Sequence, residues 1–295
     1  MADSSRLEGP CVRVVVPAHN AAAFLGETLQ SLVDQEGAPR FRVVVVVSAS
    51  VDDTERVAQS FADRLDLVVA HTSVPGGNVA RNHGAQMAGD ERYLLFLDHD
   101  DVAEPTWVRN LVGALATLDV ALGRYALDRL NSKATRDLRG PAPFVEVPET
   151  WERSMLRGQG GNCGWRKTAW DEVGGLDETH NFVDDVEILW RADDCGKRIG
   201  YVADATIQYR LRPTPMGYFM QYVHRYEGWA HLHAQFPDRV PRRTVFQFTK
   251  QVAWLVVHLP RAFSSDPARK GSWIAPAARV TGSLRGSLKH RTVYL

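Results

Sequence analysis

The 295-residue sequence contains little cysteine, and its cysteines follow no metal-binding pattern. Cys11, Cys163 and Cys195 are an odd number without the paired spacing of zinc ligands. The sequence therefore favours neither a disulfide-stapled fold nor a structural zinc site, and it suits a reducing, cytoplasmic compartment. The first ten residues, MADSSRLEGP, lack the basic and apolar regions of a secretory signal peptide.

Long apolar runs and phosphate-binding loops are missing as well. The most apolar late segment, residues 251–260, has about half of the ~20 residues that a membrane span needs. No GxGxxG or GxxxxGKS/T pattern follows a predicted strand. These absences argue against a membrane-spanning protein, a dinucleotide-binding domain and a P-loop enzyme.

Charge is balanced over the whole chain but not along it. Lys and Arg number 35 and Asp and Glu number 35, which gives a net charge of zero. Residues 240–295 hold ten basic side chains and one acid, Asp266, a net +9, which leaves 25 basic and 34 acidic side chains, or −9, in residues 1–239. Such a basic segment either faces an anionic surface or substrate, or it packs on the acidic part of its own chain.

Short apolar runs alternate with helical patterns over the first hundred residues. Strands are predicted at 11–16, 41–47, 65–70 and 93–97, with helices at 22–35, 52–62 and 78–88 between them. The strand runs are rich in valine and do not alternate with polar residues, which is typical of strands buried on both faces. The pattern predicts a three-layer α/β/α domain with a mainly parallel central sheet and right-handed crossovers.

The second half of the sequence is less regular. A strand near 120–130, a mobile loop at 131–148, helices at 184–195 and 214–236 and strands within 199–209 are expected. We predict one domain over residues 1–239, with a nucleotide-binding half at about 11–130 and an acceptor half at about 131–239, and a basic helical extension at 240–295.

The stretch YLLFLDHDDVAEP, residues 93–105, passes from an apolar strand directly into three carboxylates, Asp98, Asp100 and Asp101. Like charges repel, and burying one is costly unless a cation compensates it. Three polar segments share a place at the carboxyl ends of predicted strands: 17–20, 48–53 and 98–101. Ligands bind at that rim in open α/β sheets, so a binding site is expected there.

Four segments in the right order resemble a family 2 glycosyltransferase of the GT-A fold, over about residues 12–236. They are RVVVPAHN, VPGGNVARNHGAQMA, LFLDHDDVAEP, and VGGLDE followed by DDVEILWRADDCGKRI. The third is similar to the family's Asp-x-Asp metal motif, and the fourth to the region that holds its acidic pair. The resemblance implies an inverting hexosyltransferase that uses Mn²⁺ or Mg²⁺ and a nucleoside-diphosphate sugar, with UDP or dTDP favoured. The acceptor would be a hydroxyl of a glycan, a glycolipid or a small molecule.

The resemblance also implies roles for single residues. Asp100 would ligate the cation, Asp98 would contact the cation or the ribose, and Asp185 would be the catalytic base. The residues expected to bind the nucleotide sugar are Pro17, His19, Asn20, Ser48, Arg81, Asp98, His99, Asp100, Gly161, Asn162 and Asp184. Asp101 is expected in a solvated loop, and Asp52 with Glu55 is expected to cap a helix.

Two departures from the family pattern leave alternatives open. Ser48 stands where relatives usually have an Asp for the base, and Tyr209 and Arg210 stand where they often carry a late His. A non-catalytic nucleotide-sugar-binding protein is therefore the main alternative. A nucleotidyltransferase fits less well, because PAHNAAAF lacks the basic Gly-rich loop it needs. No nucleic-acid partner is expected; a homodimer and peripheral contact with the inner membrane face through residues 240–295 are left open.

Overall fold

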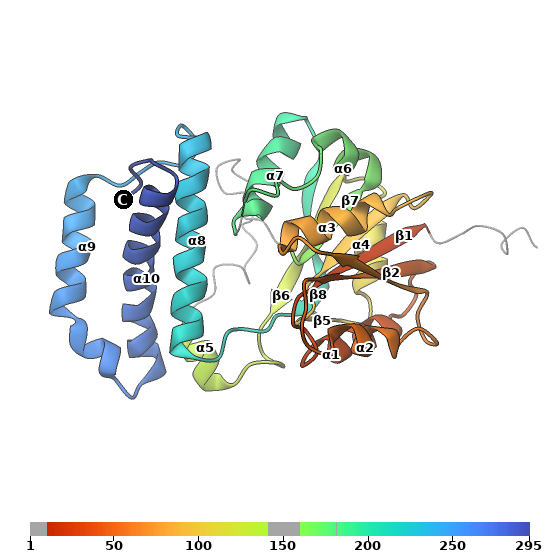
Figure 1. Cartoon of the computed structure of the whole chain (residues 1–295), viewed down its shortest axis with the longest axis horizontal. Coiled ribbons are helices and arrows are strands. Elements are labelled where there is room, and N and C mark those ends of the chain that lie inside the picture. Colours follow the sequence, from red (N-terminus) through yellow and green to blue (C-terminus); the bar gives the residue numbers. More distant parts are fainter. Residues whose placement is uncertain (1–10, 141–159, 181) are drawn as a thin grey trace, which may run out of the picture. The chain divides into compact units, whose positions relative to one another are not determined.

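The computed structural model describes residues 11–140, 160–180 and 182–295, which form two compact units (Figure 1). Of the described residues, the first unit takes in 11–126, 160–178 and 188–209, and the second takes in 127–140, 179–180, 182–187 and 210–295. These units do not coincide with the domains predicted from the sequence, which were divided after residue 239. That domain division stays a prediction.

An eight-stranded mixed sheet, counted over the described residues, is the centre of the first unit, with the order β3-β2-β1-β4-β7-β6-β8-β5. Its strands are β1 Val12–Ala18, β2 Phe41–Ser48, β3 Leu67–Thr72, β4 Tyr93–Leu97, β5 Val102–Ala103, β6 Val120–Ala126, β7 Asn162–Arg166 and β8 Ile199–Gln208. β3, β2, β1 and β4 are parallel to one another. β7 runs antiparallel between β4 and β6, β8 is parallel to β6, and β5 is antiparallel to β8.

Helices cover both faces of this sheet, which confirms the predicted three layers (Figure 1). They are α1 Leu25–Val33, α2 Thr54–Gln59, α3 Gly77–Gln86, α4 Trp107–Ala114, α6 Lys167–Val173 and α7 Asp184–Asp194. Val14 and Val16 of β1 join one core with Leu29 of α1. Val15 points to the other face, where a Cβ added to Gly84 of α3 would lie 2.5 Å from its Cγ1. The valine runs are thus buried on both faces, as predicted.

The second unit is helical in the part that the structure describes. It holds α5 Lys133–Arg139, α8 Pro215–Gln235, α9 Val245–Val257, the 3₁₀ helix η3 Leu259–Phe263 and α10 Pro267–Lys289. The prediction of a loop over 131–148 was wrong for 133–139, because Ser132 caps a short helix there through the Thr135 amide. Residues 141–148 of that loop lie outside the described residues. None of the described helices is both long and apolar enough to span a bilayer.

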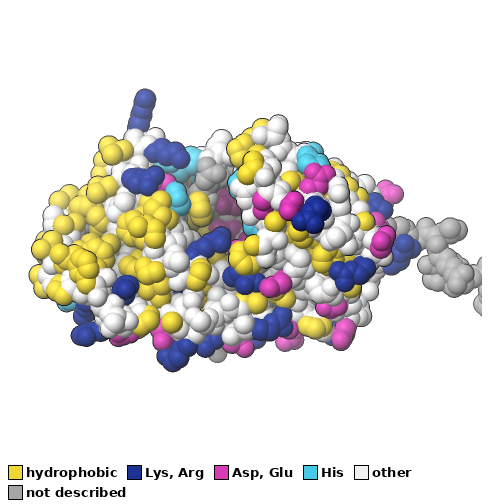
Figure 2. All heavy atoms as spheres, turned by 60° about the horizontal axis from the view of Figure 1, so that its bottom comes forward, with side chains coloured by type: hydrophobic (Ala, Val, Ile, Leu, Met, Phe, Trp, Pro, Cys, Tyr) yellow, Lys and Arg dark blue, Asp and Glu magenta, His cyan; other side chains and the backbone are white. Residues whose placement is uncertain are grey.

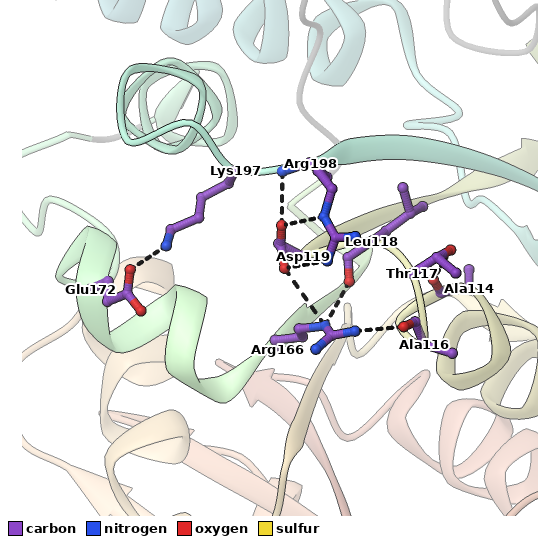
Figure 3. A network of polar contacts seen from close by, with 9 residues as sticks. All are labelled: Ala114, Ala116, Thr117, Leu118, Asp119, Arg166, Glu172, Lys197 and Arg198. Carbon is purple, nitrogen blue, oxygen red and sulfur yellow. Dashed lines mark hydrogen bonds and ion pairs between the residues drawn. The ribbon is translucent and has the colours of Figure 1, made fainter.

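A polar network joins the amino-terminal ends of β6 and β8 to the end of β7 (Figure 3). Asp119 accepts hydrogen bonds from the Arg198 amide at 2.9 Å and from its guanidinium Nε and Nη2 at 3.0 and 3.2 Å. Arg166 donates to the carbonyls of Leu118 and Ala116 at 2.9 and 2.7 Å. Because the network lies at the amino-terminal ends of β6 and β8, away from the carboxyl ends where ligands bind, we assign it to fold stability.

Asp119→Asn should lower the melting temperature by about 2–4 °C at pH 7. The hydrogen bond from Arg198 is the main cause that lowers the pKa of Asp119 in the folded chain. The charged carboxylate therefore stabilises the fold above its unfolded pKa, near 3.8, and the stabilisation is lost as the pH falls through the lower folded value. Melts of wild type and variant between pH 7 and pH 3 should converge, whereas Asp63→Asn should match wild type throughout. A gap that stays constant with pH would contradict this account.

Candidate active site

The carboxyl ends of β1, β2 and β4 lie on one rim because these strands are parallel neighbours. His19, just after β1, has its Nδ1 2.6 Å from the carbonyl oxygen of Ser48 at the end of β2. His99, just after β4, has its Nδ1 2.9 Å from the carbonyl oxygen of Pro17. The structure thus brings together the predicted site residues from three strand ends. Both imidazoles are positioned through main-chain carbonyls of neighbouring strands.

The loops after β1 and β2 are joined through Asn20. Its amide nitrogen donates to the Ser50 hydroxyl at 3.0 Å, and its side-chain oxygen accepts from the Val51 amide at 3.0 Å. Asn20 and Ala49 both have positive φ, 47° and 45°, a conformation that residues other than glycine rarely adopt. Such strain persists only where surrounding contacts fix it, and it is concentrated at functional sites.

Asp52 and Thr54 make a second link between these loops, and sequence reasoning missed it. The Asp52 carboxylate accepts from the Ala22 amide at 3.0 Å, and the buried Thr54 hydroxyl accepts from the Ala21 amide at 2.7 Å. The hydrogen bond from the Thr54 hydroxyl is the main cause that lowers the pKa of Asp52. The predicted Asp52–Glu55 cap is found only in part: Asp53 precedes α2, but Asp52 Oδ1 accepts a hydrogen bond from the amide of Thr54, the first residue of α2, at 3.1 Å. Asp52 also holds the two loops together.

The Asp98 carboxylate lies between the guanidinium of Arg81 and the backbone of Gly161. Arg81 of α3 donates from Nη2 to Asp98 Oδ1 at 2.5 Å, and only 14% and 30% of the two side chains are exposed. On the other side, a Cβ added to Gly161 would lie 2.2 Å from Asp98 Oδ2. The close approach requires glycine at 161. Three residues predicted separately from the sequence therefore meet at one carboxylate.

The turn that carries Asp100 and Asp101 is hydrogen-bonded to α1. The buried Thr28 hydroxyl lies 2.8 Å from the His99 carbonyl oxygen and 2.7 Å from that of Asp101. Asp100 is 8% exposed and Asp101 is completely buried. The expectation of a solvated Asp101 was therefore wrong, because the turn folds back onto α1. A threonine on the apolar face of a predicted helix was the signal that could have revealed this contact.

Two of the predicted binding residues have buried side chains that hydrogen-bond to other groups of the protein. Ser48 is 3% exposed, and its hydroxyl is 3.3 Å from both the Val74 carbonyl oxygen and the Gly76 amide. Asn162 is completely buried, accepts from the Trp107 indole at 2.7 Å and donates to the Arg124 carbonyl at 2.9 Å. A nucleotide sugar would therefore meet the backbone at these positions more readily than the side chains.

Asn82, next to Arg81, connects α3 to the glycine-containing segment before α7. Its side chain donates to the Leu176 carbonyl at 2.8 Å and accepts from the Leu176 amide at 2.9 Å. Asn78, one turn earlier, donates to the Asp177 carbonyl at 3.0 Å. One face of α3 thus holds Asp98 through Arg81, and another fixes residues 176–177.

Asp184 and Asp185 begin α7, and they belong to the second unit together with the segment that precedes them. Phe182 and Val183 both have positive φ, 70° and 57°, and for a β-branched residue such as Val183 this is a genuine outlier. The segment lies directly on α8, where a Cβ added to Gly228 would be 2.6 Å from the Phe182 carbonyl oxygen. The acidic pair is therefore preceded by strained backbone in close contact with a helix.

Aromatic stacking also fixes this segment within the second unit. His180 is 1% exposed and stacks on His231 of α8 with a centroid distance of 4.0 Å. His231 in turn stacks on His290, just past α10, at 4.1 Å, and burial is the main cause that lowers the pKa of His290. Phe182 stacks on His224 of α8 at 5.3 Å. No sequence pattern indicates these contacts, because the histidines come from three separate segments, with His224 and His231 both on α8.

The donor set at the rim suits a divalent cation that is shared with a phosphate. Over the residues that the structure describes, no group of three or more His, Cys, Asp or Glu side chains could hold a metal ion. Asp98 and Asp100 offer hard oxygen donors on one turn, and Mg²⁺ is commonly bound by one or two carboxylates with substrate phosphates and water. Asp98 and Asp100 therefore fit a divalent cation whose other ligands are phosphate or water, and the residues described by the structure form no all-protein metal cage.

Comparison with curated proteins gives relatives that are glycosyltransferases or proteins of polysaccharide synthesis. A validoxylamine A glucosyltransferase of Streptomyces hygroscopicus subsp. limoneus is 38% identical over 110 residues, 36% of this chain and 24% of the relative. The succinoglycan biosynthesis protein ExoO of Rhizobium meliloti is 28% identical over 218 residues, 69% of this chain and 61% of the relative. The matches span from about a quarter to three fifths of these two relatives' own lengths.

Solved structures share the fold over nearly the whole chain. The mannosyltransferase PcManGT of Pyrobaculum calidifontis, in complex with GDP-Man and Mn²⁺, matches with a TM-score of 0.68 at 17% identity, over 96% of this chain and 88% of its own. Residues 1–349 of TarS of S. aureus, in complex with UDP, match with a TM-score of 0.55 at 19% identity, over 96% and 93%. At such identities the likeness shows the fold alone, and it confirms the predicted GT-A fold.

A protein-family model matches the part of the chain that contains the rim. The model of glycosyl transferase family 2 matches residues 13–174, more than half of the 295 residues. This range includes β1 without its first residue, β2 to β4, the Arg81–Asp98 pair, Gly161 and the turn of Asp100. The chain belongs to glycosyl transferase family 2.

Proposed function

We propose that the protein is an inverting, metal-dependent glycosyltransferase that moves a hexosyl group from a nucleoside-diphosphate sugar to an acceptor hydroxyl. The observation that carries the proposal is the arrangement around Asp98. An arginine and a close-lying glycine hold this carboxylate at the carboxyl end of β4, two residues before the buried Asp100. Cys11, Cys163 and Cys195 form no disulfide, which suits a cytoplasmic location, and we include that location in the proposal.

A nucleoside-diphosphate sugar is the donor that this rim suits best. Solved proteins of the same fold were captured with GDP-Man, with UDP and with UDP-GlcNAc. In this chain the buried hydroxyl of Ser48 hydrogen-bonds to the backbone of segment 74–76. Recognition of the base would therefore rely on backbone groups and on His19. We propose UDP or dTDP as the nucleotide, and transfer assays on UDP-, dTDP- and GDP-sugars test this choice.

Asp98 and Asp100 are the residues that would hold a divalent cation. When bound there with the donor, Mn²⁺ or Mg²⁺ would offset the negative charge of the departing diphosphate. Arg81 fixes the Asp98 carboxylate in position, and its guanidinium brings positive charge to the same place. Gly161 leaves room for the donor and for Asp98 at once, because no side chain separates them.

Asp185 is the proposed base that takes the acceptor proton as the acceptor oxygen attacks the anomeric carbon. It lies in the first turn of α7, where the helix N-terminus stabilises a carboxylate. Its Oδ1 accepts from the Val186 amide at 3.0 Å, which fixes the carboxylate at the start of the helix. Asp184 precedes it, and two adjacent acids push their pKa values apart, so each can have its own role.

The main alternative is a protein of this family that binds nucleotide sugar without transferring it. Labelled UDP-, dTDP- and GDP-sugars, offered with water alone and with a panel of glycan and small-molecule acceptors, separate the two. Release of nucleotide or a labelled product supports the enzyme. Tight binding with no turnover across the panel, with and without Mn²⁺, would favour the binding protein.

Asp100→Asn should remove the Mn²⁺ dependence of nucleotide binding and weaken UDP binding in Mn²⁺ at least tenfold. The change keeps the shape of the side chain and removes its charge, so the melting temperature should change little. Calorimetric titration with UDP, with and without Mn²⁺, measures the effect, and Asp63→Asn is the exposed control. An unchanged response of the variant to Mn²⁺ would remove Asp100 from the proposed metal site.

Asp185→Asn should lower turnover by a factor on the order of 10²–10⁴ while the KM for the donor stays nearly constant. The amide cannot accept the proton, but it can still accept the hydrogen bond from Val186. Asp194→Asn, at the exposed end of the same helix, should transfer sugar at the wild-type rate. If Asp185→Asn turned over normally, Asp184 and Glu187 would be the next candidates.

Gly228→Ala should reduce turnover about 10- to 100-fold without weakening UDP binding, because small displacements of a catalytic group are costly. The new Cβ would meet the Phe182 carbonyl oxygen at 2.6 Å and displace the segment that leads to Asp185. Gly113→Ala is the matched control, since nothing lies within 4 Å of its added Cβ. It should keep full activity and stabilise α4 slightly. Wild-type turnover in Gly228→Ala would show that this contact does not position the base.

A further inference from the structure

The outer side of α9 is apolar and exposed along its whole length. None of the 13 residues of α9 is buried. Positions that share one face by helical spacing are Val245, Phe246, Thr249, Val252, Ala253, Val256 and Val257, and all seven are exposed. Phe246, Val256 and Val257 are 75%, 69% and 73% exposed. We call the apolar members of this set, together with Leu259 and Phe263 of η3, the α9 face.

The opposite side of α9 rests on α10, so the α9 face points away from its own unit. The Trp273 indole of α10 donates to the Leu255 carbonyl at 2.9 Å, and Gln251 donates to the Pro276 carbonyl at 3.2 Å. Trp254 and Leu255, on that inner side, are only partly exposed. Within the helical unit, α10 lies between α9 and α8 (Figure 1). Figure 2 shows hydrophobic side chains gathered over the same end of this unit.

Exposed basic residues lie before, within and after the segment that forms the α9 face. Arg242 precedes the helix, Lys250 borders the face, and Arg269 follows η3, and all three are exposed. The whole segment 240–295 has ten basic residues and one acid, Asp266, whose carboxylate caps α10 through the Ala268 amide. The partner of this surface must therefore tolerate apolar contact and supply negative charge.

We propose that α9 and η3 bind the surface of a membrane that contains anionic lipid. The α9 face would enter the boundary between headgroups and acyl chains, and the basic residues around it would contact lipid phosphates. A helix with one apolar face and basic flanks lies in the plane of that boundary and does not span the bilayer. Its exposed apolar side chains are Val, Leu and Phe, whereas protein-binding hot spots favour Trp, Tyr and Arg. This inference does not depend on the proposed function.

Sedimentation of the full chain with vesicles tests the proposal. Vesicles of phosphatidylcholine with about 30% phosphatidylglycerol should carry the protein down at low salt, while pure phosphatidylcholine should leave it in solution. High salt should weaken binding, because the basic residues are exposed and screened. Equal binding to neutral and anionic vesicles, or binding to neither, would overturn the proposal.

Phe246→Glu with Val256→Glu should weaken vesicle binding at least tenfold, and Lys250→Ala should weaken it about fivefold. Val51→Glu, at a 92% exposed valine of the first unit, is the matched control and should bind like wild type. Circular dichroism and the melting temperature check the fold, and Phe263→Ser, at an 81% exposed position, serves if the double variant unfolds. Wild-type binding by the double variant would also refute the proposal.

Light scattering without lipid separates the membrane from a second copy of the chain. The proposal expects the same mass for wild type and for Phe246→Glu with Val256→Glu. A wild-type dimer that this double variant converts to a monomer would show that the α9 face is a self-interface, and the membrane assignment would fall.

Discussion

The turn after β4 depends on groups from other elements that fix its backbone and thereby the position of its carboxylates. Asp101 has no exposed surface and Asp100 has 8%, and a buried carboxylate loses much of its hydration. Thr28 of α1 hydrogen-bonds two carbonyls of this turn, and His99 contacts the Pro17 carbonyl of β1. The turn can therefore keep its negative charge at a fixed place. That constraint makes the rim suitable for a cationic, phosphate-bearing ligand.

Backbone strain is found in the loops expected to do the chemistry. Of the five non-glycine residues with positive φ among those described, Asn20 and Ala49 follow β1 and β2, and Phe182 and Val183 precede α7. Each pair is fixed by neighbours: Asn20 by Ser50 and Val51, and the α7 segment by stacking and by Gly228. A strained loop holds its side chains in one geometry before a ligand binds, which lowers the cost of ordering them later.

The parallel half of the fold could be predicted from sequence, because valine runs without alternation rarely form anything but strands buried on both faces. The segment 17–20 and the Asp98 turn were placed on one rim for the same reason, and the structure bears out that placement. The buried state of Asp101 was not predictable, since it depends on Thr28, which is 73 residues away in sequence. Helix α5 was missed because its seven residues give too short a pattern. Asn162 was expected to bind the nucleotide sugar, but its side-chain oxygen accepts a hydrogen bond from the Trp107 indole.

In the helical unit, α10 packs mainly through small residues, whereas α9 exposes large apolar side chains. Where α10 is buried it presents mostly small residues, and a Cβ added to Gly282 would lie 2.3 Å from the Val223 carbonyl oxygen of α8. A Cβ on Gly271 would clash with the Leu138 carbonyl of α5 in the same way. The backbone of α10 therefore approaches α8 and α5 closely at these glycines. Phe246 and Phe263 remain in contact with water, where an apolar patch of this kind marks an interaction surface more often than a free one. The same packing that makes α10 a firm support thus leaves α9 available for a partner outside the chain.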